Sequence, residues 1–313
     1  MSAVADIPLV SIVIPAYNCG KYIAATLDSI LAQHFQNFEI IIVNDGSTDD
    51  TPEMLQQQSL RDNRITLVHQ ANGRQGKARN NGIGHARGSW VAFLDADDLW
   101  MPEKLSVQLE KTLASGADMS FTDGFICLNN QMDLEQYRFG VENRLFQGPE
   151  AIEAFHLQNR VPTSTVLVKR EVLLAAGGFP EDLVIQNCED YFLWTLLLTK
   201  GFRLLGIATP LLRYRVYPES STGTEIKGLR PLLVCLLRIP GEHGKARQIH
   251  LEKTLLRLLS LSKTQDELSW FNPWIASVTT AIRQGTLSRL MRFCWQVHPR
   301  LYISLLWRTR ITH

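Results

Sequence analysis

The sequence predicts an α/β fold with a central, mostly parallel sheet, flanking helices and a helical extension at its C-terminal end. Three observations support this prediction. Apolar runs of strand length alternate with amphipathic stretches over about the first hundred residues, which is typical of a doubly wound sheet. An apolar share of 45% and a charged share of 20% are typical of a folded chain with a sizeable core. After Gly228 the alternation is lost and leucine-rich, basic stretches replace it.

The predicted elements can be followed along the chain. The expected strands are Val10–Ile14, Phe38–Val43, Ile65–His69, Trp90–Leu94, Met119–Leu128 and Thr163–Val168. The first four are separated by three helices. Asn18 is expected to cap the first helix. Thr51 is expected to be the N-cap of the second, with Pro52 in its first turn. The third is expected over Gly76–Ala86, which leads directly into the fourth strand.

Polar turns follow three of these strands where each strand ends. They are Pro15-Ala16-Tyr17-Asn18, Asn44-Asp45-Gly46-Ser47 and Asp95-Ala96-Asp97-Asp98. The carboxyl ends of parallel strands meet at one edge of a sheet, where open α/β folds bind their ligands. The three turns therefore predict a nucleotide pocket.

Two side chains near this edge have both a binding role and a structural alternative. Asp45 is suited to accept a hydrogen bond from a base N–H or a ribose hydroxyl, and the alternative is a turn formed with Gly46. Arg79 is suited to contact phosphate, and the alternative is a solvated helix face. The sequence does not decide between these roles.

Asp95 and Asp97 predict a site for Mg²⁺ or Mn²⁺. Because they are two residues apart, they point the same way in extended geometry. Carboxylate oxygens are hard ligands that suit these ions, with phosphate oxygens and water completing the shell. The alternative is that Asp97 and Asp98 cap a helix opened by Pro102.

Glu189 and Asp190 open an apolar helix that is expected to end near Lys200. Acidic residues in a first turn commonly interact with the helix dipole, which is the structural interpretation. The functional interpretation is that Asp190 is a general base that a rigid helix holds near the site. Both interpretations remain open at this point.

Composition and charge exclude several classes of protein. Five scattered cysteines without a C-x-x-C pair argue against disulfides and structural zinc. Gly82-Ile83-Gly84-His85-Ala86-Arg87-Gly88 spaces its glycines wrongly for NAD and precedes a strand. No signal peptide or spanning segment is visible, so we expect a cytoplasmic protein. We also expect no nucleic-acid partner.

The C-terminal part differs from the rest in charge. Residues 228–313 hold 13 Lys or Arg against 4 Asp or Glu, whereas residues 1–227 hold 19 against 27. We therefore expect two parts, a catalytic domain at 1–227 and a basic helical region at 228–313. Arginine and aromatic residues alternate over Leu287–Arg310, which favours either peripheral membrane contact or a helical cap on the catalytic domain.

Taken together, these motifs resemble glycosyltransferase family 2, whose fold is the Rossmann-like GT-A fold. The resemblance covers roughly Val10–Ser221. The matching segments, in the order of the family, are Val13–Asn18, Val43–Asp49, Asn72-Gly73, Gly76–Ile83, Phe93–Asp98 and Glu189–Trp194. The segment Tyr214–Ser220 also resembles one of the family, with one departure: Tyr217 stands where the family commonly has histidine near the diphosphate.

The resemblance implies an inverting, metal-dependent transfer of a sugar from a nucleoside-diphosphate sugar, with UDP the expected nucleotide. It implies a saccharide or lipid-linked acceptor and a place in cell-surface polysaccharide or glycolipid synthesis. It assigns Asp95 and Asp97 to ribose and metal, and Asp190, beside Glu189, to the base. The residues that it places on the donor are Pro15, Ala16, Tyr17, Asn18, Asp45, Gly46, Ser47, Gly76, Arg79, Asp95 and Ala96.

Two other functions also fit the residues. A metal-dependent phosphatase or nucleotidyltransferase would use Asp95 and Asp97, but a haloacid-dehalogenase phosphatase carries its acidic pair after the first strand. A non-catalytic sugar-binding scaffold is the other alternative, because a fold does not fix a function. The presence of every expected acid argues against a scaffold.

Overall fold

The computed structural model describes residues 7–128, 131–133, 135, 137–216, 225–241 and 244–261. The chain divides into two compact units. The first unit comprises Met1–Gly148, Arg160–Glu181 and Leu196–Ser220; the second comprises Pro149–Asn159, Asp182–Thr195 and Ser221–His313. The predicted boundary after residue 227 stays a prediction. Tyr217 and the basic stretch Leu287–Arg310 lie outside the described residues.

The first unit is built on one sheet, whose described strands follow the order β3-β2-β1-β4-β9-β6-β10-β5. Two short strands lie off this path, with β7 pairing β6 and β8 pairing β10. The bounds are β1 Val10–Ala16, β2 Phe38–Asp45, β3 Ile65–Gln70, β4 Trp90–Phe93, β5 Leu99–Trp100, β6 Met119–Leu128, β7 Tyr137–Arg138, β8 Arg144–Phe146, β9 Leu167–Lys169 and β10 Leu204–Val216.

The strands that lead to the predicted site are parallel to one another. β1 lies between β2 and β4, and Val10 pairs with Phe38 on one side and with Trp90 on the other. This register brings the residues after β1, β2 and β4 to the same edge of the sheet. Residues 10–14 of β1 are fully buried, as expected for a central parallel strand that is covered on both faces. The prediction of a mostly parallel central sheet is confirmed.

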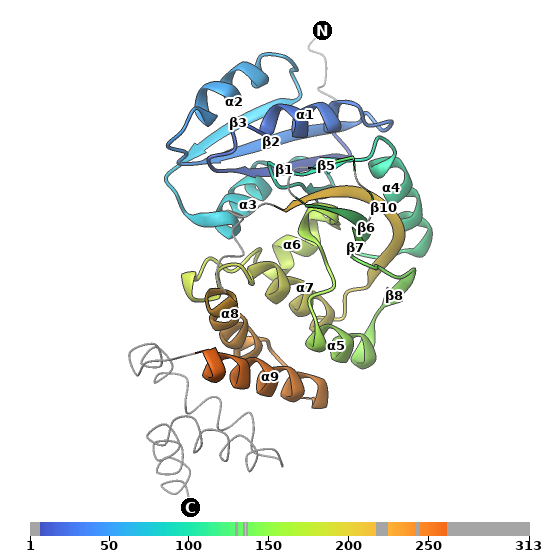
Figure 1. Ribbon diagram of the computed structural model, residues 1–313. Coiled ribbons are helices and arrows are strands. Elements are labelled where there is room, and N and C mark those ends of the chain that lie inside the picture. The colour runs from blue at the N-terminus through green and yellow to red at the C-terminus, as the bar shows by residue number, and fades with distance from the viewer. Residues whose placement is uncertain are drawn as a thin grey trace, which may run out of the picture. The chain divides into compact units, whose positions relative to one another are not determined.

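Helices cover both faces of this part of the sheet. α1 (Ile23–Leu31) and α2 (Thr51–Ser59) lie on one face, and α3 (Arg74–His85) lies on the other (Figure 1). α3 packs closely because Gly82 has no side chain there; a Cβ atom would lie 2.4 Å from Cγ1 of Val13. α4 (Lys104–Ser115) and α6 (Arg170–Ala176) also belong to this unit.

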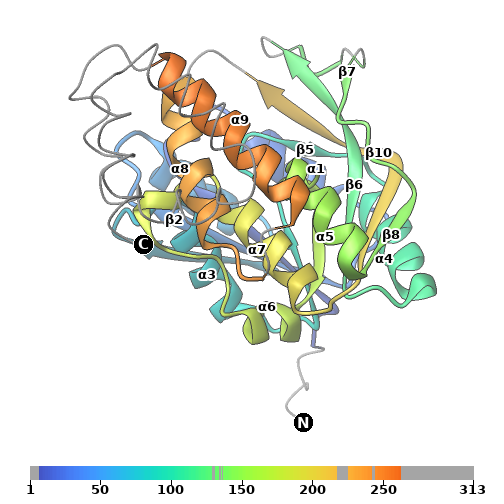
Figure 2. The same cartoon turned by 90° about the horizontal axis from the view of Figure 1, so that it is seen from below.

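The described part of the second unit is helical. It contains α5 (Gly148–Leu157), the short 3₁₀ helix η2 (Leu183–Ile185), the first part of α7 (Glu189–Thr199), α8 (Glu225–Arg238) and α9 (Lys245–Leu261). Figure 2 shows α8 and α9 side by side. A buried hydrogen bond joins them, in which Arg247 Nε of α9 donates to the carbonyl of Leu236 of α8 at 2.7 Å.

The described helices include none that is long and apolar enough to cross a membrane. The four cysteines within the described ranges are free thiols. Burial raises the pKa of the Cys19 thiol to about 12, so this thiol is a weak nucleophile at neutral pH.

Three local predictions are wrong. Asn18 does not cap α1, which begins at Ile23; it bonds to the next loop instead. Thr51 is inside α2, because Asp50 occupies the N-cap position. Within Thr163–Val168 the first three residues form a 3₁₀ helix, η1 (Thr163–Thr165), and the strand begins only at Leu167.

Candidate active site

Hydrogen bonds join the loops after β1 and β2. The backbone amide of Asn18 donates to Oγ of Ser47 at 3.1 Å, and the amide of Thr48 donates to Oδ1 of Asn18 at 2.8 Å. Asn44 Oδ1 accepts from the amide of Ser47 at 3.1 Å. Asn18 adopts a positive φ of 49°, which asparagine tolerates better than most residues. These contacts hold two of the three predicted turns together.

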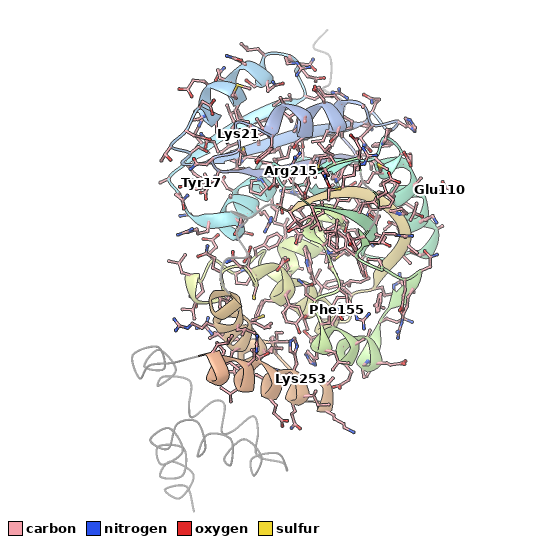
Figure 3. The ribbon with its side chains drawn as sticks, viewed as in Figure 1. Tyr17, Lys21, Glu110, Phe155, Arg215 and Lys253 are labelled. Atoms are coloured by element: carbon pink, nitrogen blue, oxygen red, sulfur yellow. The ribbon has the colours of Figure 1, made fainter. Side chains whose placement is uncertain are left out.

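The residues predicted to hold the donor at these two turns differ in exposure. Tyr17 is exposed at the carboxyl end of β1, where Figure 3 labels it, whereas Ala16 is buried. Gly46 has a φ of +70°, and a Cβ atom on it would lie 2.8 Å from the amide nitrogen of Asn72. Glycine at position 46 therefore lets the turn after β2 approach the loop before α3.

Asp45 is only 3% exposed and accepts three hydrogen bonds within the protein. Its Oδ1 accepts from Gln70 Nε2 and from the amide of Gly73, each at 2.7 Å. Its Oδ2 accepts from the amide of Arg74 at 2.8 Å. Gly73 is the N-cap of α3 and Arg74 its first residue, so Asp45 caps this helix from a neighbouring strand. A turn between Asp45 and Gly46 alone does not explain the three hydrogen bonds that this carboxylate accepts.

Arg79 is buried in α3 and does not lie on a solvated helix face. Its Nη2 lies 2.8 Å from Oδ1 of Asp95, and its guanidinium carbon is 5.4 Å from the ring centre of Phe179. The Asp95 side chain is 32% exposed. The alternative of a solvated face is therefore wrong, and contact between Arg79 and phosphate stays a prediction. Gly76 is buried in the same helix.

Asp98 is fully buried and does not cap the next helix, which begins at Lys104. Ser164 Oγ donates to its Oδ2 at 2.6 Å, and the amide of Arg215 donates to its Oδ1 at 2.9 Å. Burial, and next the charges of Asp97 and Asp95, raise the pKa of the Asp98 carboxyl well above its usual value. The helix-cap alternative is thus wrong for Asp98.

Side chains from α1 and β10 fix the backbone of Ala96 and Asp97 in the turn after β4. The carbonyl of Ala96 accepts from Thr26 Oγ1 of α1 at 2.9 Å. The carbonyl of Asp97 accepts from Arg215 Nε of β10 at 2.8 Å, and Figure 3 labels Arg215. The Asp97 side chain is half-buried.

The donor set at this turn fits a divalent cation. Asp95 and Asp97 offer carboxylate oxygens, which Mg²⁺ and Mn²⁺ prefer. Within the described ranges no group of three or more His, Cys, Asp or Glu side chains could hold a metal ion. Asp95 and Asp97 would supply protein ligands to the cation here, and ligand oxygens and water would complete the shell.

Glu189 and Asp190 lie in the second unit, in the first turn of α7. Glu189 is buried and Asp190 is half-buried. Oδ1 of Asp190 accepts from the amide of Tyr191 at 2.6 Å, and the Tyr191 hydroxyl donates to the carbonyl of Phe155 at 2.9 Å. The helix that the sequence predicts here is confirmed. The catalytic roles of Glu189 and Asp190 stay predictions.

The three strand-end turns and Arg79 thus meet at one edge of the first unit's sheet. Ser164 and Arg215 also contact this site, although sequence analysis did not assign them to it. The segment that begins at Tyr214 was part of the resemblance to the family, and it was the only signal for Arg215. No pattern in the sequence pointed to Ser164.

Comparison with known proteins identifies the family. The protein-family model described as "Glycosyl transferase family 2" matches residues 11–173 of this chain. The putative teichuronic acid biosynthesis glycosyltransferase TuaG of Bacillus subtilis (strain 168) is 33% identical over 225 residues, which is 71% of this chain and 85% of TuaG. The chain belongs to glycosyltransferase family 2.

A second relative and a solved structure agree with this assignment. The Escherichia coli protein named UDP-Glc:alpha-D-GlcNAc-diphosphoundecaprenol beta-1,3-glucosyltransferase WfaP is 33% identical over 225 residues, 71% of this chain and 82% of WfaP. The crystal structure of S. aureus TarS 1–349 in complex with UDP has a TM-score of 0.60 at 22% identity, covering 95% of this chain and 86% of that one.

The glycosyltransferase therefore has the predicted GT-A fold, which the likeness to TarS supports independently of sequence. Membership of the family confirms that the protein is an enzyme that transfers sugars. It also decides against the phosphatase and the non-catalytic scaffold.

Proposed function

We propose that this glycosyltransferase moves a sugar from a UDP-sugar to an acceptor hydroxyl, with inversion at the anomeric carbon and with help from Mg²⁺ or Mn²⁺. The observation that carries the proposal is the meeting of Asp45, Asp95 and Asp97 at the carboxyl edge of parallel strands. Such an edge is where α/β sheets bind nucleotides. UDP is the expected nucleotide because WfaP is named for UDP-Glc and TarS was solved with UDP.

The donor would lie across the turns after β1 and β2. Pro15, Ala16, Tyr17 and Asn18 would line one side, and Asp45, Gly46 and Ser47 the other. Three of the roughly four acceptor positions of the Asp45 carboxylate are already used within the protein. The acceptor position that remains would suit one hydrogen-bond donor on the nucleotide-sugar, such as an N–H group or a hydroxyl.

Asp97 and Asp95 would hold the cation on the diphosphate. When bound, the cation would offset the negative charge that develops on the leaving diphosphate. Arg79 would keep the Asp95 carboxylate oriented, because it holds one of its oxygens at 2.8 Å. Glu189 would accompany Asp190 at the reacting end of the donor.

One general base is sufficient for the transfer step. The acceptor O–H gives its proton to the Asp190 carboxylate while the acceptor oxygen bonds to the anomeric carbon. The bond from that carbon to the β-phosphate oxygen breaks, and its electron pair leaves with UDP. A single displacement inverts the anomeric centre.

The acceptor class follows from the relatives and from charge. WfaP is named for a diphosphoundecaprenol-linked acceptor, and TuaG for teichuronic acid biosynthesis. We therefore propose a saccharide or lipid-linked acceptor in cell-surface polysaccharide or glycolipid synthesis. The net charge of the predicted C-terminal region, with 13 basic against 4 acidic residues, would favour an anionic membrane surface.

The test is UDP release from a panel of UDP-sugars with and without Mn²⁺, comparing wild type with Asp97→Asn. Asp97→Asn keeps the shape of the side chain and removes its charge, so activity should fall by orders of magnitude. Asp118→Asn is the matched control, because this substitution also removes a carboxylate charge, that of the ion pair with Lys169, away from this turn. Near-normal activity of Asp97→Asn in EDTA would contradict the metal assignment.

A further inference from the structure

One buried carboxylate is linked to the backbone of both proposed cation ligands. Asp98 is 0% exposed, and the proposed chemistry does not use it. Its two oxygens accept from different elements, Oδ2 from Ser164 of η1 and Oδ1 from the amide of Arg215 of β10. Its own amide donates to the carbonyl of Asp95 at 3.2 Å, which closes the turn.

Each hydrogen-bond partner of Asp98 also bonds to the backbone of one proposed cation ligand, Asp95 or Asp97. Ser164 Oγ gives its single proton to Asp98, so a lone pair on that oxygen accepts the amide of Asp95 at 3.1 Å. Arg215 Nε donates to the carbonyl of Asp97 at 2.8 Å. One intermediate residue therefore lies between Asp98 and the backbone of Asp95, and one between Asp98 and the backbone of Asp97.

Both intermediate residues are held in place by their own contacts. The indole Nε1 of Trp100 donates to the carbonyl of Ser164 at 2.8 Å. The guanidinium of Arg215 lies over the ring of Tyr22, 4.6 Å from its centre. The network is therefore anchored in η1, β10 and the start of α1, and a shift of the turn would have to break buried hydrogen bonds.

We infer that Asp98 is a positioning residue, which acts through Ser164 and Arg215 to aim the carboxylates of Asp95 and Asp97 at the divalent cation. This inference rests on the proposed function, because it assumes that this pair binds the cation. Residues that orient metal ligands matter nearly as much as the ligands, and their loss typically weakens metal binding about 10- to 100-fold.

The chain offers a matched control for Ser164. Ser11 Oγ accepts from the amide of Gly88 at 2.8 Å and donates to Oε1 of buried Glu39 at 2.7 Å. Ser11 and Ser164 thus bridge a backbone amide and a buried carboxylate in the same way, and both are buried, at 0% and 2% exposure. Ser11 is near the start of β1, whereas Asp95 follows the carboxyl end of β4.

The experiment measures Mn²⁺ binding to the full chain in the presence of UDP, using the electron paramagnetic resonance signal of free Mn²⁺. Ser164→Ala and Ser11→Ala should lower the melting temperature to a similar extent, because each loses the same kind of buried bridge. Only Ser164→Ala should weaken Mn²⁺ binding, by about tenfold or more. Ser164→Thr, which keeps a hydroxyl, should restore the affinity.

A second variant tests the hydrogen bond between Arg215 and the carbonyl of Asp97. Arg215→Lys removes the Nε donor to Asp97 but keeps the backbone amide on Asp98, and it should also weaken Mn²⁺ binding. Wild-type Mn²⁺ affinity in both Ser164→Ala and Arg215→Lys would overturn the inference and leave the proposed function intact. Absence of Mn²⁺ binding in wild type saturated with UDP would instead overturn the proposed metal site, and the inference with it.

Discussion

Replacement of Asp45 by asparagine tests whether this carboxylate holds both helix α3 and the nucleotide. The asparagine side chain has one carbonyl oxygen and one NH₂ group in place of two oxygens. In its better orientation the oxygen keeps the bonds from Gln70 and Gly73, and the NH₂ group faces the amide of Arg74. Two donors then face each other at a site that is 3% exposed in the native protein.

The expected loss of stability follows from these contacts. A buried backbone donor left without a partner costs about 1–3 kcal/mol. Removing a negative charge from a helix N-terminus costs about a further 0.3–1 kcal/mol. The free energy of unfolding should therefore fall by roughly 1–4 kcal/mol. Asp45→Ala removes the acceptor for all three donors and should cost more.

The assay is urea unfolding together with a UDP titration of each variant. Asp28→Asn is the control, since Asp28 forms an exposed ion pair with Arg61 and should cost about 0–1 kcal/mol. Asp45→Asn should also weaken UDP binding, whereas Asp28→Asn should not. If Asp45→Asn unfolds at the same urea concentration as Asp28→Asn, Asp45 does not hold α3 and the reasoning is wrong.

Three further predictions follow from other parts of the chain. Asp190→Asn should abolish transfer and leave UDP affinity within a few fold, because a base acts in the transition state; joint loss of affinity and melting temperature would identify a structural residue instead. Burial alone would raise the pKa of Glu39, but hydrogen bonds from Ser11 and Arg87 lower it below 4.5. Its stabilising effect is therefore present above pH 4.5 and lost as pH falls through the native pKa, so urea midpoints of wild type and Glu39→Gln should converge in acid. Replacing the arginines of Leu287–Arg310 by glutamine should reduce co-sedimentation with anionic liposomes, most clearly at low salt, and unchanged sedimentation would exclude membrane contact through them.

The part of the site that lies on parallel strands was predictable from sequence. Runs such as Val10–Ile14 and Phe38–Val43 are long enough and apolar enough to identify central strands, and parallel pairing brings their carboxyl ends together. The convergence of the loops containing Asn18, Asp45 and Asp95 follows from that geometry alone. The prediction required no knowledge of side-chain contacts.

The contacts that orient the acidic turn were not predictable in this way. Asp98 meets Ser164 and Arg215 across 66 and 117 residues of sequence, and no local pattern signals such a contact. Strand β10 was also missed, because Gly206 and Pro210 interrupt its apolar pattern. The structure accommodates this interruption with register shifts around Pro210 against β6.

Burial of Arg79 changes how the two acids of the turn should share a cation. Arg79 offsets the charge of Asp95 at 2.8 Å from within the protein, so Asp95 offers less net attraction to a metal ion than its carboxylate alone would. The carbonyl of Asp97 accepts from Arg215 Nε at 2.8 Å, so this contact fixes the backbone that carries the Asp97 carboxylate. We therefore expect Asp95 to contribute less to cation binding than a carboxylate without a buried arginine beside it would. The network around Asp98 would then keep both carboxylates directed at the cation even though Arg79 weakens the attraction of one of them.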